Sequence, residues 1–217
     1  MKRSLIASVV LAAAVCASLG AQTQSGKAAS DALAVQKARA DSARYPYTAA
    51  DIEFMQGMIH HHAQAIQMAK MAPSHGASPA VVTLCNRIIN AQTDEINFMS
   101  LWLRDRNQEV PEPTPGPMKM KMGGMEHEML MPGMLSPEQM QALDAARGQD
   151  FDRLFLEGMI QHHTGAVSMV HDLEGSYGAD QDLIIQKLSQ DIQVDQTTEI
   201  ARMKKMHAEI ILGVKLP

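Results

Sequence analysis

Cysteine, aromatic residues and positive charge are all scarce in this sequence of 217 residues. It has two cysteines, one tryptophan, three tyrosines and four phenylalanines, and its formal net charge is −5. Cys16 lies in an apolar run near the N-terminus, so loss of that run would leave Cys85 alone and exclude an intrachain disulfide. A mildly acidic chain is also poorly suited to binding nucleic acid. The fold must therefore be held by packing, and no nucleic-acid partner is expected.

The sequence motifs of several enzyme classes are missing as well. Glu-x-x-His, which di-iron carboxylate bundles carry on two helices, does not occur. Neither the haem-attachment motif Cys-x-x-Cys-His nor a paired nucleophile and base is found. We therefore do not expect an enzyme.

The first 21 residues predict an export signal. Lys2 and Arg3 precede an apolar run from Leu5 to Leu19, and small residues follow. That order is typical of a secretory signal peptide, and the run is shorter than the roughly 20 residues that a membrane-spanning helix needs. We expect cleavage after segment 1–21, a periplasmic or extracellular mature protein, and no stable membrane insertion afterwards.

Methionine, by contrast, is abundant, with 18 residues. A core of Met, Leu, Ile and Ala suits helices better than sheets. The chain after the signal divides into a polar lead-in with a short helix (22–47), a helical hairpin (48–106), a Pro/Gly/Met-rich linker (107–135) and a second helical hairpin (136–217). The linker is not expected to pack regularly.

Local signals predict where the helices begin and end. Thr48 with Asp51 resembles a capping box, Ser78 is followed by a first-turn Pro, and Ser136 combines a first-turn Pro with Gln139 at the capping-box position. The long helices are expected to end near Ala72, Arg106, Leu173 and Ile211, with the last starting at Asp180 and a possible interruption at Gly148.

An internal repeat is the most specific feature of the chain. Met58-Ile59-His60-His61-His62 is echoed by Met159-Ile160-Gln161-His162-His163. At the same offset Asp51, Phe54, Gly57, Ala65 and Met68 match Asp152, Phe155, Gly158, Ala166 and Met169. The helices that follow repeat too: Leu84, Ile88, Gln92, Glu95 and Met99 match Leu188, Ile192, Gln196, Glu199 and Met203. Two such hairpins would bury their apolar faces on each other, which predicts an all-α four-helix bundle.

Helical spacing brings methionine and histidine to one side of each repeated helix. Met58 precedes His61 and His62 by three and four residues, and Met159 stands in the same relation to the second pair. Imidazole with thioether favours copper, and thioether favours Cu(I) or Ag(I) over Zn(II). We therefore predict a copper site, Cu(I) first with Ag(I) or Cu(II) possible, formed by Met58, His61, His62, Met68, Met159, His162, His163 and Met169.

The buried histidines can also be explained without a metal ion. Glu95 and Glu199 fall on the apolar seams of the second helices, where they could hydrogen-bond to His62 and His163. Such buried polar networks would suit a non-metal periplasmic interaction or adaptor protein that uses them for specificity.

Further candidate ligands lie outside the repeated His pairs. Linker methionines have no core to fill there, which leaves soft-metal capture or an adaptable contact surface. His75 and His171 are expected to be solvated. The further candidates are Met99, Met203, Met206 and His207 on the hairpins, and Met122, Met125, His127 and Met129 in the linker.

The doubled pattern D-x-x-F-x-x-x-M-I-x-H-H-x-x-A-x-x-M, from Asp51 to Met68 and from Asp152 to Met169, resembles the family catalogued as domain of unknown function 305. So does Met131-Pro132-Gly133-Met134-Leu135 in the linker. The resemblance implies a ferritin-like bundle, often exported, with copper binding and tolerance in some members. It makes His61, His62, His162 and His163 the prime candidate ligands. The position before each His pair, often Pro in that family, holds His60 and Gln161 here. The expected function is metal tolerance, storage or transfer.

Overall fold

The computed structural model describes residues 47–122 and 125–214, together with residues 33 and 36. The predicted signal peptide, and the predicted lead-in apart from residues 33, 36 and 47, lie outside the described residues. No helix in the described part of the chain is both long and apolar enough to cross a membrane.

The described part is almost entirely helical, so the all-α prediction is confirmed. Two short strands form an antiparallel hairpin between the halves. The helices are α2 (Ala49–Met71), α3 (Pro79–Asp105), α4 (Pro137–Ala145), α5 (Gln149–Gly175) and α6 (Leu183–Leu212), and the strands are β1 (Met118–Met122) and β2 (Met125–Met129).

Most of the predicted helix starts are confirmed. Thr48 and Asp51 form a reciprocal capping box, and so do Ser136 and Gln139. Gly148, with φ of 60°, separates α4 from α5. The last helix begins later than predicted, because Asp182 rather than Asp180 caps it. Asp180 has φ of 57°, which is incompatible with a helical position.

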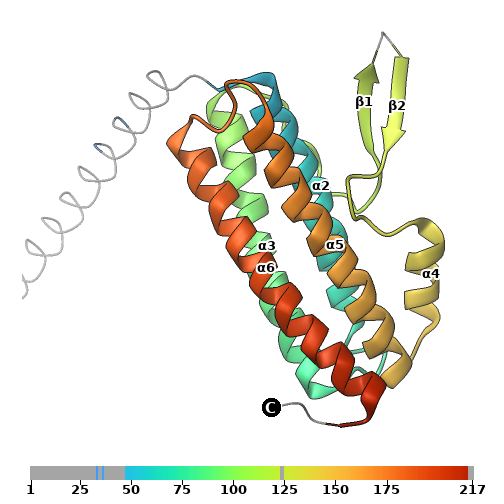
Figure 1. Ribbon diagram of the computed structural model, residues 1–217. Helices are drawn as coiled ribbons and strands as arrows, with labels where there is room; N and C mark the ends of the chain where they lie inside the picture. Colours follow the sequence, from blue (N-terminus) through green and yellow to red (C-terminus); the bar gives the residue numbers. More distant parts are fainter. Residues whose placement is uncertain (1–32, 34–35, 37–46, 123–124, 215–217) are drawn as a thin grey trace, which may run out of the picture. The chain divides into compact units, whose positions relative to one another are not determined.

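The four long helices pair as two hairpins. α2 packs on α3, α5 packs on α6, and the hairpins meet along α2 and α5 (Figure 1). Gly57 and Gly158 chiefly leave room for the segment that follows the strands: a Cβ on Gly57 would lie 2.9 Å from Met131 Sδ, and one on Gly158 would lie 2.9 Å from Leu135 Cδ2. Met169 and Met68 of the opposite repeat come next, at 3.5 and 3.3 Å.

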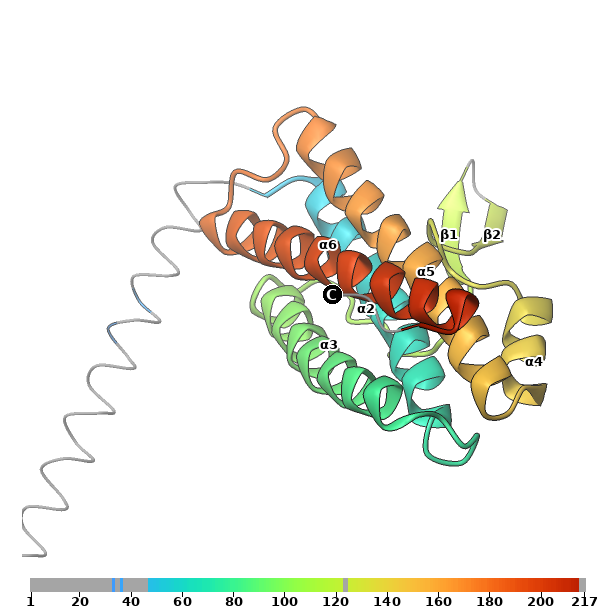
Figure 2. The ribbon, with the colours of Figure 1, turned by 60° about the horizontal axis from the view of Figure 1, so that its bottom comes forward.

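The linker is more ordered than predicted. In the strand register Met118 is paired with Met129 and Met122 with Met125, so the expectation that the linker does not pack regularly is wrong for 118–122 and 125–129. The strand hairpin formed by β1 and β2 lies on the α2 and α5 side of the molecule, as does α4 (Figures 1 and 2).

Residues 131–135, which we call the strap, belong to the core although they were predicted as linker. Met131, Met134 and Leu135 are buried. Gln64 of α2 fixes the strap by donating to Leu135 O at 3.0 Å and accepting from Leu135 N at 2.7 Å. The strap therefore lies against the helices that carry the His pairs.

Candidate metal centre

The four repeated histidines form one continuous row across the interface of α2 and α5. The ring centroids of His61 and His162 are 3.7 Å apart, with the ring planes inclined by 40°. His62 lies beside His61 at 6.3 Å, and His163 lies beside His162 at 6.2 Å. All four side chains are fully buried. We call this set the histidine row, and it joins the two halves of the repeat.

Some nitrogens of the histidine row have protein partners. His61 Nε2 lies 3.0 Å from the Pro132 carbonyl of the strap. His163 Nε2 is hydrogen-bonded to Glu199 at 2.8 Å. His62 Nε2 lies 2.6 Å from Glu95 Oε2, but the pair lacks hydrogen-bond alignment. The predicted contacts of Glu95 and Glu199 with the histidines are thus confirmed.

Five buried nitrogens of the row have neither a hydrogen-bond nor an ion-pair partner in the structure. A buried polar atom left without a partner is costly, and most native proteins carry few of them. Such atoms in one cluster indicate either strain or a missing ligand. They are Nδ1 of His61, His62, His162 and His163, and Nε2 of His162, whereas His62 Nε2 has only the close contact with Glu95.

Burial keeps the central imidazoles neutral. It lowers the pKa of His61 from 6.5 to about 3, with the neighbouring His62 as the next cause. Burial, followed by His61 and His163, lowers the pKa of His162 well below 6.5. A neutral imidazole has a free lone pair, which is the form that binds metals.

The row alone is not a finished metal site. Within residues 47–122 and 125–214, no three His, Cys, Asp or Glu side chains converge closely enough to hold an ion. To hold an ion there, either methionine sulfurs would have to join the histidines as ligands or the imidazole rings would have to rotate. Met58 and Met159 are fully buried, and each lies one helical turn before its His pair.

The other predicted methionines of the bundle have packing roles. Met68 and Met169 are buried over the glycines of the opposite repeat. Met99 and Met203 are fully buried in the two core clusters. Met206 is partly buried beside Met203 in the same cluster.

Outside the bundle core the predicted candidates are dispersed. His207 Nε2 lies 3.0 Å from Glu157 Oε1, which links α6 to α5. Met129 is half exposed at 47%. In the strand register Met122 is paired with Met125, and His127 with Met120. His207 is thus engaged with Glu157 rather than with the histidine row.

Two features of the site were missed by the sequence analysis. The strap falls within the predicted linker, although its Met-Pro-Gly-Met-Leu stretch is one of the family-like motifs and could have indicated it. His75 was predicted to be solvated and is buried, with Nε2 2.9 Å from the Asp144 carbonyl and Nδ1 2.9 Å from Ser74 Oγ. Its ring nitrogens are both occupied, unlike those of the row.

Fold and site together define a helical protein built from two repeated hairpins that meet at buried histidines. The chain belongs to the DUF305 family (domain of unknown function), whose model matches residues 51–207.

Solved structures of the family resemble this one. A presumed secreted DUF305 protein from Streptomyces coelicolor is 26% identical, with a TM-score of 0.62 over 77% of this chain and 96% of that one. A DUF305 fragment from Deinococcus radiodurans is also 26% identical, with a TM-score of 0.62 over 76% of this chain and 99% of that one. CopM in its Cu(II)-bound form is 31% identical, with a TM-score of 0.55 over 73% of this chain and 96% of that one. CopM has also been solved with Cu(I) and with Ag. No curated protein matches the chain.

Proposed function

We propose that this protein is an exported copper-binding protein that holds Cu(I) at the histidine row for metal tolerance, storage or transfer. The observation that carries the proposal is the cluster of five buried ring nitrogens with neither a hydrogen-bond nor an ion-pair partner. His61, His62, His162 and His163 would supply imidazole, and Met58 and Met159 would supply thioether.

The chemistry of the row fits a soft monovalent ion. Its central imidazoles are neutral, so binding does not require the loss of a proton from them. Thioether sulfur selects Cu(I) or Ag(I) over Zn(II), which prefers a closed set of four nitrogen or thiolate ligands. Because no three His, Cys, Asp or Glu side chains converge among the described residues, a Zn(II) site is disfavoured.

The relatives support the same metal and the same location in the cell. CopM, about 30% identical over most of the chain, binds Cu(I), Cu(II) and Ag. The Streptomyces coelicolor relative is presumed to be secreted. Export also agrees with the Lys-Arg start and apolar run of the N-terminal sequence. We propose binding rather than catalysis as the activity.

The test is a Cu(I) titration of the purified mature protein against a competing chromophoric chelator under reducing conditions. The double variant His61→Phe/His162→Phe removes the centre of the row while keeping planar side chains in the interface. We expect it to lose at least one high-affinity ion. His171→Phe, an exposed position on α5, is the matched control and should behave like the wild type.

A protein that takes no Cu(I) from the chelator at micromolar metal would contradict the proposal. The contacts of Glu95 with His62 and of Glu199 with His163 would then be read as a polar network within a structural or adaptor protein. Equal stoichiometry in the wild type and the double variant would instead place the copper outside the row.

A further inference from the structure

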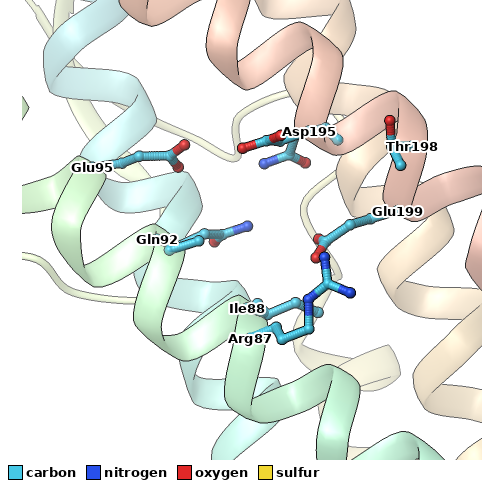
Figure 3. A pocket seen from close by; sticks show the side chains of 9 residues that line it. Arg87, Ile88, Gln92, Glu95, Asp195, Thr198 and Glu199 are labelled. Atoms are coloured by element: carbon cyan, nitrogen blue, oxygen red, sulfur yellow. The ribbon is translucent and has the colours of Figure 1, made fainter.

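A second, chemically different site lies between α3 and α6. The backbones of these helices do not approach each other as those of α2 and α3 or of α5 and α6 do, and a pocket of about 110 Å³ remains between them. Gln92 and Glu95 reach it from α3, and Asp195 and Glu199 from α6 (Figure 3). One water needs about 10–15 Å³ on this measure, so the pocket has room for several.

Two amide oxygens at the pocket have no partner. Gln92 and Gln196 are each only 3% exposed, both line the pocket, and neither Oε1 accepts a hydrogen bond within the protein. Figure 3 shows the Gln92 side chain extending into the space between the helices. The internal repeat thus supplies the same unsatisfied acceptor twice, once from each hairpin.

The charge of the pocket is negative. Glu95, Asp195 and Glu199 line it, and Arg87 is the single basic residue of the lining. Burial raises the pKa of Asp195, with Glu95 and Glu199 adding to the effect and Arg87 opposing it. The three carboxylates therefore repel one another, and a cation between them would relieve that repulsion.

The atoms of the pocket that could bind a metal ion are all oxygens of carboxylate, amide or hydroxyl groups. Such ligands favour hard cations such as Mg²⁺, Ca²⁺ or Mn²⁺ over copper. The carboxylates of the described residues are not close enough to hold a bare ion. A Mg²⁺-like ion, which gives up its waters reluctantly and binds through only a few protein groups, meets that condition. We propose that the pocket between α3 and α6 binds one hydrated divalent cation, with Gln92, Gln196 and the carboxylates accepting from its waters. Glu95 and Glu199 also contact His62 and His163, so the two sites are neighbours, but this one needs no copper at the histidine row.

The experiment uses Mn²⁺ as the probe on chelator-treated mature protein without copper. Bound Mn²⁺ is counted by the loss of its free electron paramagnetic resonance signal. We expect one ion per chain, with water-proton coupling and no nitrogen coupling in the pulsed spectrum. Failure of copper binding would leave this result unchanged, so the two proposals can fail separately.

Variants that remove a negative or a positive charge at the pocket should change the Mn²⁺ affinity in opposite directions. Asp195→Asn should weaken Mn²⁺ binding about tenfold, the effect of one charge on a divalent ion at hydrated distance in water. Arg87→Gln should strengthen it. Asp150→Asn, an exposed acid at the start of α5, is the matched control and should change little. All three positions are exposed, so the variants should fold.

Three results would overturn the proposal. No loss of the free signal at millimolar Mn²⁺ would show that the pocket takes no such ion. Nitrogen coupling would place the ion on the histidines instead. Equal weakening by Asp195→Asn and Asp150→Asn would mean that only the overall charge of the protein matters.

Discussion

At the scale of single residues, the contact between His61 and His162 decides the chemistry of the interface. Their rings lie 3.7 Å apart with no exposure to water. A proton on either ring would place an unsolvated charge beside another imidazole. The pKa of both side chains is therefore lowered, and the fold depends on their remaining neutral.

This predicts a specific loss of stability in acid. In the unfolded chain both histidines take up a proton near the ordinary value of 6.5, whereas in the folded chain His61 does so only near 3. Between these two pKa values the unfolded state therefore binds more protons than the folded state. The contribution of these two histidines to stability is therefore complete above about pH 6.5 and is lost as the pH falls, for His61 until about pH 3, by up to roughly 1.4 kcal/mol per pH unit for each histidine.

Urea unfolding of the metal-free protein at a series of pH values measures this slope. His61→Phe/His162→Phe should remove much of it, since Phe does not titrate, and His171→Phe should not. If the wild type and the double variant lost stability equally between pH 6.5 and 4, the two buried histidines would not be the cause.

Gly165 fixes the strap over the site. Its counterpart in the first repeat is Gln64, which makes two hydrogen bonds to the Leu135 backbone of the strap. A Cβ on Gly165 would overlap the Pro132 carbonyl. Gly165→Ala should therefore cost about 1–3 kcal/mol, as overpacking of a core does.

The control for this change is Gly175→Ala at the end of α5, where an added Cβ meets nothing within 4 Å. It should be neutral or slightly stabilising, because Ala favours a helix over Gly. Thermal and urea unfolding of both variants give the comparison. Equal stability of the two would mean that the strap moves aside at no cost.

At the scale of elements, each repeated helix holds the loop of the other hairpin. Asp51 of α2 accepts from Asp180 N at 2.9 Å, in the loop before α6. Asp152 of α5 accepts from Ser78 N at 3.1 Å, at the start of α3. Asp51 and Asp152, the first residues of the two motif copies, thus each accept a backbone hydrogen bond from the loop of the other helical hairpin. Its repetition reflects the packing of the two halves as much as any metal site.

The strands β1 and β2 pair mainly with each other, so they should be removable. Replacing residues 119–128 by Asn-Gly would join the paired residues Met118 and Met129 through a two-residue turn. We expect the unfolding free energy to change by no more than about 0.5 kcal/mol, as for surface changes. We predict that the methionines and His127 of these strands also bind Cu(I), so the Cu(I) stoichiometry should fall on their removal, while the affinity at the histidine row stays.

Circular dichroism, urea unfolding and the chelator titration measure these three quantities. A full-length control with Leu at the methionines of 120–125 and at His127 separates loss of ligands from loss of length. Unchanged stoichiometry in both proteins would show that the Met-rich hairpin does not bind copper.

At the scale of the whole molecule, the sequence predicted what depends on near neighbours. Capping at Thr48 and Ser136 depends on residues within one turn, and those helix starts are right. The contact of His62 with Glu95 followed from the seams of two helices joined by a short turn. The fold class followed from the repeat.

What the sequence could not provide depends on how separate elements cross. The approach of His61 to His162 is set by the crossing of α2 and α5, which spacing along one helix does not specify. Burial of the strap depends on the fit of Pro132 to Gly165, two residues far apart in the chain. The pocket between Gln92 and Gln196 arises because α3 and α6 stay apart, and no local pattern encodes that separation.

Because the histidine row spans both hairpins, metal there should stabilise the molecule as one unit. Ag(I), a soft ion without redox chemistry, is a convenient probe. At 100 times its Kd, an ion bound only to the folded state adds about 2.7 kcal/mol. For a chain of this size, that corresponds to a rise in Tm of roughly 5–11 °C. Scanning calorimetry should show a single transition shifted upward.

The variant without residues 119–128 should keep this shift, because an ion held only by β1 and β2 would barely stabilise the helices. His61→Phe/His162→Phe should lose it, and His171→Phe should retain it. Two separate transitions in the presence of Ag(I) would mean that the ion binds within one hairpin. In that case the contact between His61 and His162 would serve to join the repeats rather than to hold a metal.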